Sequence, residues 1–258
     1  GVALFSGLGS QDARALTPVD LELVLAVDVS GSVDFEEAAL QRHGYIQAIS
    51  SPEFAKAVTG GVLGRIAVIY VEWAGEDVQA TVLDWRVIDG AASAAAFAKS
   101  LAAAPISTGP WTSISDAINY AVPLLEGNQF QGTRRVIDIS GDGPNNTGAL
   151  VTGARADAIA KGITINGLPI INDRPSRYGN APMPHLDNYY RDCVIGGFGA
   201  FIVVANTYQD FARDIRRKMI LEIAGITPRP DERGQGPREA RTMLAASEVH
   251  PPCDVGEI

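Results

Sequence analysis

Short apolar runs alternate with segments of helical periodicity along most of this chain. The run from Leu21 to Val27 is rich in Val and Leu and almost unbroken, as expected of a strand buried on both faces of a parallel sheet. Residues 112–125 instead repeat their apolar positions at the spacing of a helix. The pattern predicts strands over residues 21–27, 65–73, 78–85, 134–139, 163–170 and 200–205, and helices over residues 34–49, 91–103, 112–125, 151–161 and 208–224.

The connection between two of these strands fixes part of the topology. Gly75-Glu76-Asp77 joins the strand over 65–73 to the strand over 78–85, and a connection that short fits only a hairpin. One strand of the pair therefore runs antiparallel and is expected at the edge of the sheet. The remaining alternation of strands and helices predicts an α/β fold, a three-layer α-β-α Rossmann-like open sheet that is otherwise parallel.

Oxygen-bearing side chains collect where predicted strands end. Asp28, Ser30 and Ser32 follow the first strand at alternating positions, Asp142 stands between two glycines after a later strand, and Thr112 precedes a helix. The carboxyl ends of the strands in such a sheet form the crevice in which ligands bind. Carboxylate and hydroxyl oxygens suit Mg²⁺, Mn²⁺ or Ca²⁺, whereas Zn²⁺ or Cu²⁺ would favour His or Cys. A plainer role stays open for each group, as a helix cap or as a turn residue.

In their order and spacing these residues resemble the metal-ion-dependent adhesion site (MIDAS) of von Willebrand factor type A (vWA) domains. The resemblance implies that Ser30 and Ser32 ligate the ion directly and that Thr112 binds it directly or through a water molecule. It implies that Asp28 and Asp142 act largely through bound water. One ligand position is then left for an acidic group of a partner.

This likeness extends over about residues 20–224. Three segments more narrowly resemble a family of exported bacterial proteins with such a domain, the DUF1194 type: residues 140–146, 189–197 and 218–224. The chain departs from the commoner pattern at Gly109-Pro110-Trp111, where a plainer glycine-rich loop is usual.

The resemblance favours a non-catalytic module that binds proteins, or mediates adhesion, through its cation. Its partner is expected to be a protein that presents an Asp or Glu carboxylate. Loops around the site would set the identity of the partner, and Trp111, Asn145 and Asn146 are the candidate contacts. Trp111 fits two roles equally, an aromatic anchor for the partner or a cap on the core.

A magnesium-dependent phosphoryl-transfer hydrolase with Asp28 as its nucleophile is the alternative. Such enzymes usually have a second carboxylate two residues further on, where this chain has Ser30. They also need a Lys or Arg to hold the phosphate, and none is evident near the strand ends. A serine hydrolase has still less support as an alternative function, because His185 is the only histidine that lies where it could act as a base.

Charge and hydropathy exclude two classes of partner. The chain of 258 residues has a net charge of −9, so nucleic acid is not expected to bind. No stretch is long and uncharged enough to span a membrane. The nearest basic cluster is interspersed with acidic residues on the last predicted helix and is interpreted as a solvated face: Arg213, Arg216, Arg217 and Lys218.

The first residues predict export. Gly1 to Gly9 is apolar and small, and Ala13-Arg14-Ala15 fits the pattern after which signal peptidase cleaves. Residues 1–15 are therefore interpreted as the remainder of a signal peptide, residues 16–224 as the vWA-like domain, and residues 225–258 as a flexible tail. The protein is expected to be periplasmic or secreted.

Two cysteines, Cys193 and Cys253, are present. An even count in an exported chain permits a disulfide, which would tie the Pro- and Gly-rich tail around Cys253 to the domain. The sequence favours this bridge slightly over one buried and one stray thiol.

Overall fold

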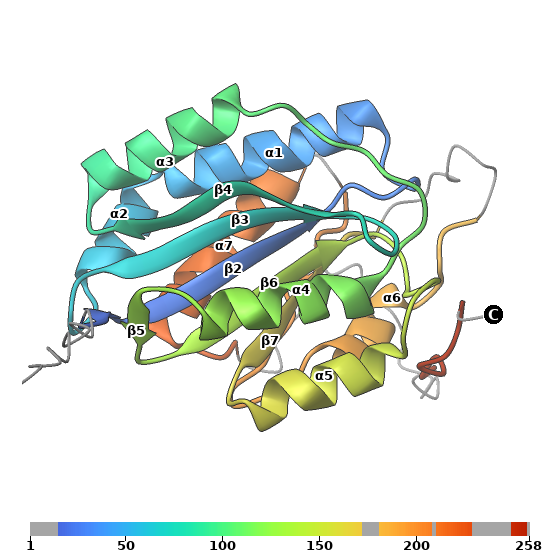
Figure 1. Ribbon diagram of the computed structural model, residues 1–258. Coiled ribbons are helices and arrows are strands. Elements are labelled where there is room, and N and C mark those ends of the chain that lie inside the picture. Colours follow the sequence, from blue (N-terminus) through green and yellow to red (C-terminus); the bar gives the residue numbers. More distant parts are fainter. Residues whose placement is uncertain (1–14, 172–180, 208–209, 229–248, 257–258) are drawn as a thin grey trace, which may run out of the picture.

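A mostly parallel sheet forms the centre of the molecule (Figure 1). The computed structural model describes residues 15–171, 181–207, 210–228 and 249–256. The sheet has the order β4-β3-β2-β6-β7, and all its neighbouring pairs are parallel except β3 and β4. Its strands are β2 (Leu21–Asp28), β3 (Ile66–Trp73), β4 (Gln79–Ile88), β6 (Arg135–Gly141) and β7 (Thr164–Pro169). The predicted α/β fold and its antiparallel edge strand are confirmed.

Both faces of the sheet are buried under helices. Leu23 and Leu25 of β2 pack on one face, whereas Val24 and Ala26 pack on the other, because side chains alternate along a strand. The first face is covered by α1 (Phe35–Ile49), α2 (Pro52–Thr59), α3 (Ala91–Ala103) and α7 (Phe211–Ala224). The second is covered by α4 (Ile114–Glu126), α5 (Val151–Ala160) and α6 (Leu186–Tyr189), which continues as the π-helical turn η1 (Tyr190–Val194).

The predicted strand over residues 200–205 is wrong as a continuous strand. Ile202 and Ala205 form only isolated parallel bridges, with Gly167 and Ile170. Pro169 of β7 lies between these bridges and has no N–H to donate, so the ladder is interrupted there. The ladder also stops short at Phe201, whose N–H donates to the Asn166 side chain (3.0 Å) instead of to a backbone carbonyl.

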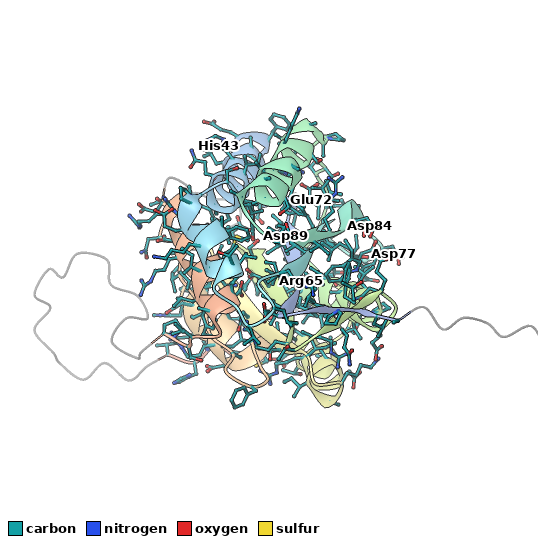
Figure 2. The ribbon with its side chains drawn as sticks, turned by 90° about the vertical axis from the view of Figure 1, so that its left-hand side faces the viewer. His43, Arg65, Glu72, Asp77, Asp84 and Asp89 are labelled. Atoms are coloured by element: carbon teal, nitrogen blue, oxygen red, sulfur yellow. A yellow bond between two sulfur atoms is a disulfide. The ribbon has the colours of Figure 1, made fainter. Side chains whose placement is uncertain are left out.

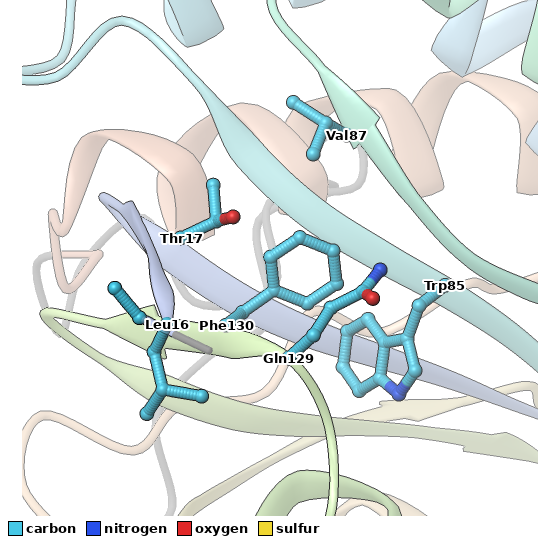
Figure 3. A pocket seen from close by; sticks show the side chains of 7 residues that line it. Leu16, Thr17, Trp85, Val87, Gln129 and Phe130 are labelled. Carbon is cyan, nitrogen blue, oxygen red and sulfur yellow. The ribbon is translucent and has the colours of Figure 1, made fainter. Parts of the chain in front are cut away.

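Five short elements were not predicted. They are α2, α6, η1 and the strands β1 (Thr17–Val19) and β5 (Phe130–Gly132), which pair in parallel apart from the main sheet. These elements are too short for their apolar periodicity to stand out in the sequence. Beside β1 and β5 lies a cavity of about 280 Å³, lined among others by Leu16, Trp85 and Phe130 (Figure 3).

The segment 249–256 belongs to the predicted flexible tail, yet it packs on the domain. A disulfide joins Cys253 to Cys193 of η1, and Asn188 donates a hydrogen bond to the Val249 carbonyl (2.8 Å). This part of the tail is therefore anchored beside α6. The predicted signal-peptide remnant consists almost entirely of residues 1–14, and these lie outside the described residues. Among the described helices, none has the length and apolar character needed to cross a membrane.

Candidate metal centre

Asp28 and Ser30 lie at the carboxyl end of β2, in the middle of the sheet. Both residues are buried, and the Ser30 backbone N–H donates to Asp28 Oδ1 (2.7 Å). The hydroxyls of Ser30 and Ser32 are 3.1 Å apart and share a hydrogen bond. The chain thus turns tightly here and places one carboxylate and two hydroxyls on the same side of the strand end.

Asp142 joins this group from the neighbouring strand. Strands β2 and β6 are parallel, with Val27 opposite Ser140, so their carboxyl ends meet at the same edge. The Ser32 hydroxyl donates to Asp142 Oδ1 at 2.5 Å. Residues 110 positions apart in the chain are therefore in direct contact.

Thr112 lies on a third segment, which hydrogen bonds connect to the segments of Ser30 and Asp142. Its N–H donates to Asn146 Oδ1 and its carbonyl accepts from the Asn146 N–H, both at 2.8 Å. The Gly109 N–H donates to the Val29 carbonyl (3.0 Å), which ties this segment to the one that carries Ser30. Backbone bonds thus fix Thr112 beside the loops of Ser30 and Asp142.

A buried ion pair holds the chain that leads to Thr112. Arg42 of α1 pairs with Glu72 of β3 and donates to the Leu101 carbonyl at the end of α3 (3.0 Å). Glu72, labelled in Figure 2, also accepts from the Ser107 N–H (3.2 Å). This ion pair was not predicted from the sequence, because neither residue stands in a recognisable motif.

The helix caps beside the site are formed by other residues than the candidate ligands. Helix α1 is capped by Asp34, which forms a reciprocal capping box with Glu37. Helix α4 begins at residue 114 and is capped by Ser113, not by Thr112 as its predicted start implied. The caps of α1 and α4 therefore do not involve the hydroxyls of Ser30, Ser32 and Thr112.

The electrostatics of the site are unusual for a protein interior. Asp28 Oδ2 is buried and has no hydrogen-bond partner among the described residues. Burial first, and then the nearby charge of Asp142, raise the pKa of Asp28 to about 8. A cation at this place would reverse both effects, because it favours the ionised carboxylates. The oxygen donors present therefore fit a hard divalent ion.

The candidate centre has fewer carboxylates than many metal sites have. Nowhere in the described part of the chain do three or more His, Cys, Asp or Glu side chains gather in a way that could hold a metal ion. The candidate centre has two carboxylates, and its other donors are hydroxyls. Hydroxyl oxygens and water would have to complete the coordination shell of an ion here.

Tyr190 is a neighbour that the sequence analysis did not single out as part of the site. Its buried hydroxyl has no hydrogen-bond partner among the described residues. A Cβ built on Gly141 would lie 2.7 Å from this hydroxyl and 2.8 Å from Asp28 Oδ2, so Gly141 allows both oxygens to approach the end of β6. Gln41 of α1 donates to the Asp28 carbonyl (3.2 Å) from the opposite face.

The three predicted partner contacts differ in access. Trp111 is 65 % exposed, so it does not cap the core. Asn146 is partly buried and is paired with Thr112. Asn145 is fully buried, because its side chain accepts from the Ser115 N–H (3.0 Å) and donates to backbone carbonyls of its own loop. In this conformation Asn145 is a support for the loop that a partner cannot reach.

A second buried carboxylate cluster lies deeper in the sheet. Lys218 of α7 is fully buried and pairs with Asp138 of β6 and with Glu222 (2.7 Å). Asn166 also donates to Glu222 (3.0 Å). Burial, and next the charge of Glu222, raise the pKa of Asp138 to about 7, while Lys218 opposes them. The interpretation of the basic cluster as a solvated face is wrong for Lys218.

Solved structures with this fold define the class of the domain. Proximal thread matrix protein 1 from the mussel byssus matches with a TM-score of 0.59 and 13% identity, over 82% of this chain and 50% of that one. A von Willebrand factor type A protein from Catenulispora acidiphila gives 0.53 and 12%, over 80% and 43%. BatB from Bacteroides thetaiotaomicron gives 0.50 and 19%, over 80% and 99%. The fold is vWA-like, although the chain spans half or less of the first two proteins.

A family model narrows the class further. The chain belongs to the family described as "Protein of unknown function (DUF1194)", whose model matches residues 18–227. The resemblance of the chain to the DUF1194 family and to the vWA fold is confirmed, whereas its metal site stays a prediction. No protein of curated function matches the sequence. A further structure of the mussel protein is described as having a zinc-occupied MIDAS motif, at 12% identity and a TM-score of 0.56.

Proposed function

We propose that this chain is a non-catalytic, metal-dependent binding domain. A divalent cation is held at the carboxyl ends of β2 and β6, and a carboxylate of a protein partner completes its coordination. The observation that carries the proposal is Asp28 Oδ2, a buried carboxylate oxygen beside Asp142 that has no hydrogen-bond partner among the described residues.

Each residue has a distinct part in this function. Ser30 and Ser32 offer hydroxyl oxygens to the ion, and Thr112 adds one from the neighbouring segment. Asp28 and Asp142 supply negative charge. Asp142 also orients the Ser32 hydroxyl, which donates to it, and Asp28 accepts from the Ser30 backbone N–H and so fixes the turn that carries both serines. The ion then has an exchangeable position towards solvent, which a hard carboxylate oxygen suits.

The identity of the ion follows from donor chemistry. Oxygen-only donors favour Mg²⁺, Mn²⁺ or Ca²⁺, and Mg²⁺ in particular retains several waters. The mussel relative with zinc in its MIDAS motif supports a divalent ion in this fold, not its identity in this chain.

A phosphoryl-transfer role for Asp28 receives no support. One carboxylate oxygen of Asp28 is occupied by the Ser30 N–H, and the carboxyl is buried behind the strand end. The loops around the site, residues 28–36, 74–78, 106–113 and 141–150, contain no Lys or Arg to hold a phosphate.

An extracytoplasmic location completes the proposal. The Cys193–Cys253 bridge fits an oxidising compartment such as the periplasm or the cell exterior. Relatives of this fold include an aerotolerance-related membrane protein from Bacteroides fragilis, at 20% identity. N-terminal sequencing of secreted or periplasmic protein should begin at or near Leu16.

Calorimetric titration with Mg²⁺, Mn²⁺ and Ca²⁺ tests the metal site. Wild-type protein should bind one ion saturably, whereas Asp28→Asn and Ser30→Ala should not. Asp89→Asn is a matched control, because Asp89 is also a carboxylate at a strand end with a serine as its hydrogen-bond partner, here the Ser93 hydroxyl (2.6 Å), but it lies exposed after β4 (Figure 2). Unchanged binding in Asp28→Asn, or loss of binding in Asp89→Asn, would reject the assignment.

A further inference from the structure

Among the described residues, four loops lie around the candidate centre, and together they carry charge of one sign. We call residues 28–36, 74–78, 106–113 and 141–150 the metal face. They contain six carboxylates and, as noted above, neither Lys nor Arg, although the chain has 21 of these residues. Two of the six, Asp28 and Asp142, belong to the site itself. The other four are exposed: Asp34, Glu36, Glu76 and Asp77.

Hydrogen bonds join these loops into one continuous rim. The Gly75 N–H donates to the Pro110 carbonyl (2.9 Å), and the Ser113 N–H donates to the Ala74 carbonyl (2.8 Å). Glu76 accepts from the Thr147 hydroxyl (2.5 Å) and from the Gly148 N–H (2.9 Å). The carboxylates of the hairpin turn between β3 and β4 therefore stand beside the loops of Thr112 and Asp142.

Large apolar side chains are exposed on the same loops. Phe35 is 68 % exposed, Trp111 65 % and Leu150 58 %. Trp111 also adopts a positive φ of 61°, which is an uncommon and costly conformation for a bulky residue. The close packing of Gly75 under Trp111 holds it there, since a Cβ on Gly75 would lie 2.9 Å from the Trp111 Cβ. An exposed aromatic ring kept in a strained backbone indicates a contact surface.

Charge balance decides what kind of partner fits this surface. A divalent cation neutralises two of the six carboxylate charges and leaves the metal face negative. Screening in physiological salt acts over about 8 Å, so charges within the rim still act on a partner that touches it. A partner whose contact segment is acidic throughout would gain one bond to the ion and meet repulsion everywhere else. Like charges placed against each other across an interface oppose binding.

We propose that the partner presents one coordinating carboxylate within a basic and apolar segment. The carboxylate binds the cation, flanking Lys or Arg side chains pair with Glu36 and Asp77, and a neighbouring apolar side chain packs on Trp111. This inference rests on the proposed function. Asp28 Oδ2, which is buried and has no hydrogen-bond partner among the described residues, independently supports this place for the cation and the carboxylate.

A peptide library tests this partner class with the full-length protein. Each displayed peptide carries a fixed central Asp between randomised positions, and selection is carried out with Mg²⁺ and again with a chelator. We expect peptides with Lys or Arg and an apolar residue beside the Asp to be enriched about tenfold over peptides with acidic flanks, with Mg²⁺ only. The enrichment should shrink as salt is added.

Charge reversal on the rim sharpens the test. The double variant Glu36→Lys/Asp77→Lys should still bind the metal and should switch the selection towards acidic or neutral flanks. The control is Asp84→Lys/Asp157→Lys, which reverses two exposed carboxylates on β4 and α5 and should keep the basic preference (Asp84 in Figure 2).

The possible results distinguish a failure of this inference from a failure of the proposed metal-dependent function. Metal-dependent enrichment of peptides with neutral or acidic flanks would overturn the basic partner and leave the metal-dependent capture of a carboxylate intact. Basic peptides enriched equally in the presence of the chelator would overturn it as well, because the cation would then play no part. If calorimetry detects bound metal and no peptide shows metal-dependent enrichment, the proposed function itself fails.

Discussion

Two clusters of buried carboxylates in this domain are built in opposite ways. At the carboxyl end of β2, Asp28 lies beside Asp142, Asp28 accepts from the Ser30 backbone N–H, and Asp142 accepts from the Ser32 hydroxyl. In the middle of β6, Asp138 lies beside Glu222, and the fully buried Lys218 pairs with both. Burial raises the pKa of Asp28 and of Asp138 alike. The second cluster contains a buried cation, Lys218, whereas Asp28 Oδ2 in the first has no hydrogen-bond partner among the described residues.

The difference separates a structural role from a binding role. An ionised carboxylate is costly to bury unless an opposite charge or enough hydrogen bonds accompany it. Lys218 supplies the opposite charge for Asp138 and connects α7 to the centre of the sheet. No side chain of the described residues supplies an opposite charge to Asp28, so this site suits a cation from solution. The two clusters should therefore respond in opposite ways when a charge is removed.

The largest effect is expected for Lys218→Met. Removing the ammonium leaves Asp138 and Glu222 buried without a cation, which should lower the free energy of unfolding by about 3–5 kcal/mol. Urea denaturation monitored by circular dichroism measures it. Arg216→Met, on the exposed side of the same helix, should change stability by less than about 0.5 kcal/mol. Adding Asp138→Asn and Glu222→Gln to Lys218→Met should recover part of the loss, and no recovery would contradict the charge argument.

Asp28→Asn should behave in the opposite sense. Without metal, the variant should be as stable as wild type or more stable, because it replaces a carboxyl whose ionised form is disfavoured by burial and by Asp142. With the ion at a hundred times its dissociation constant, wild type should gain about 2.7 kcal/mol and the variant nothing. Thermal unfolding with and without Mg²⁺ gives both numbers. A metal-free variant that unfolds several kcal/mol more easily would mean that Asp28 is structural.

The pH dependence of metal-free protein provides a third test. The pKa of Asp28 is about 8 in the folded state and about 4 in the unfolded chain, so the folded state binds more protons between these values. Stability should therefore fall as the pH rises from about 4 to about 8, by at most about 1.4 kcal/mol per pH unit from this residue.

The comparison with Asp28→Asn isolates that contribution. Asp138 has a raised pKa in both proteins and its effect cancels in the difference between them. Denaturation at several pH values should give a steeper fall for wild type than for the variant. Saturating Mg²⁺ should flatten the wild-type curve at high pH, because the ion binds the ionised carboxylates. Equal slopes for the two proteins would mean that the Asp28 carboxyl does not titrate as its burial implies.

The smallest effect on stability is expected at Trp111. Trp111→Gly removes an exposed ring and relieves a positive φ, so the free energy of unfolding should change by less than about 1 kcal/mol. Metal affinity should be unchanged, while binding of a basic, apolar Asp peptide should weaken about tenfold. Isothermal titration with metal and then with peptide separates the two. Loss of metal binding in this variant would show that Trp111 supports the site and not the partner.

The sequence by itself determined the architecture and the position of the polar groups along it. The apolar run of β2, the short turn before β4 and the periodicity of α4 each reflect local patterning that survives in the folded state. Asp28, Ser30, Ser32, Thr112 and Asp142 could be named because a strand end or a helix start is visible from neighbouring residues. The parallel order of the strands then predicted that distant segments would share one edge.

Only the tertiary structure decided how those groups are used. The length of the last extended segment depended on Pro169 in its neighbour, and the burial of Lys218 depended on two carboxylates, one of them 80 positions earlier in the chain. Asn145 is a buried loop support and Trp111 an exposed ring, although they stand in similar loops. Local periodicity does not encode these contacts. Residues become buried, and their charges are compensated, through contacts in the folded protein between segments that lie far apart in the sequence.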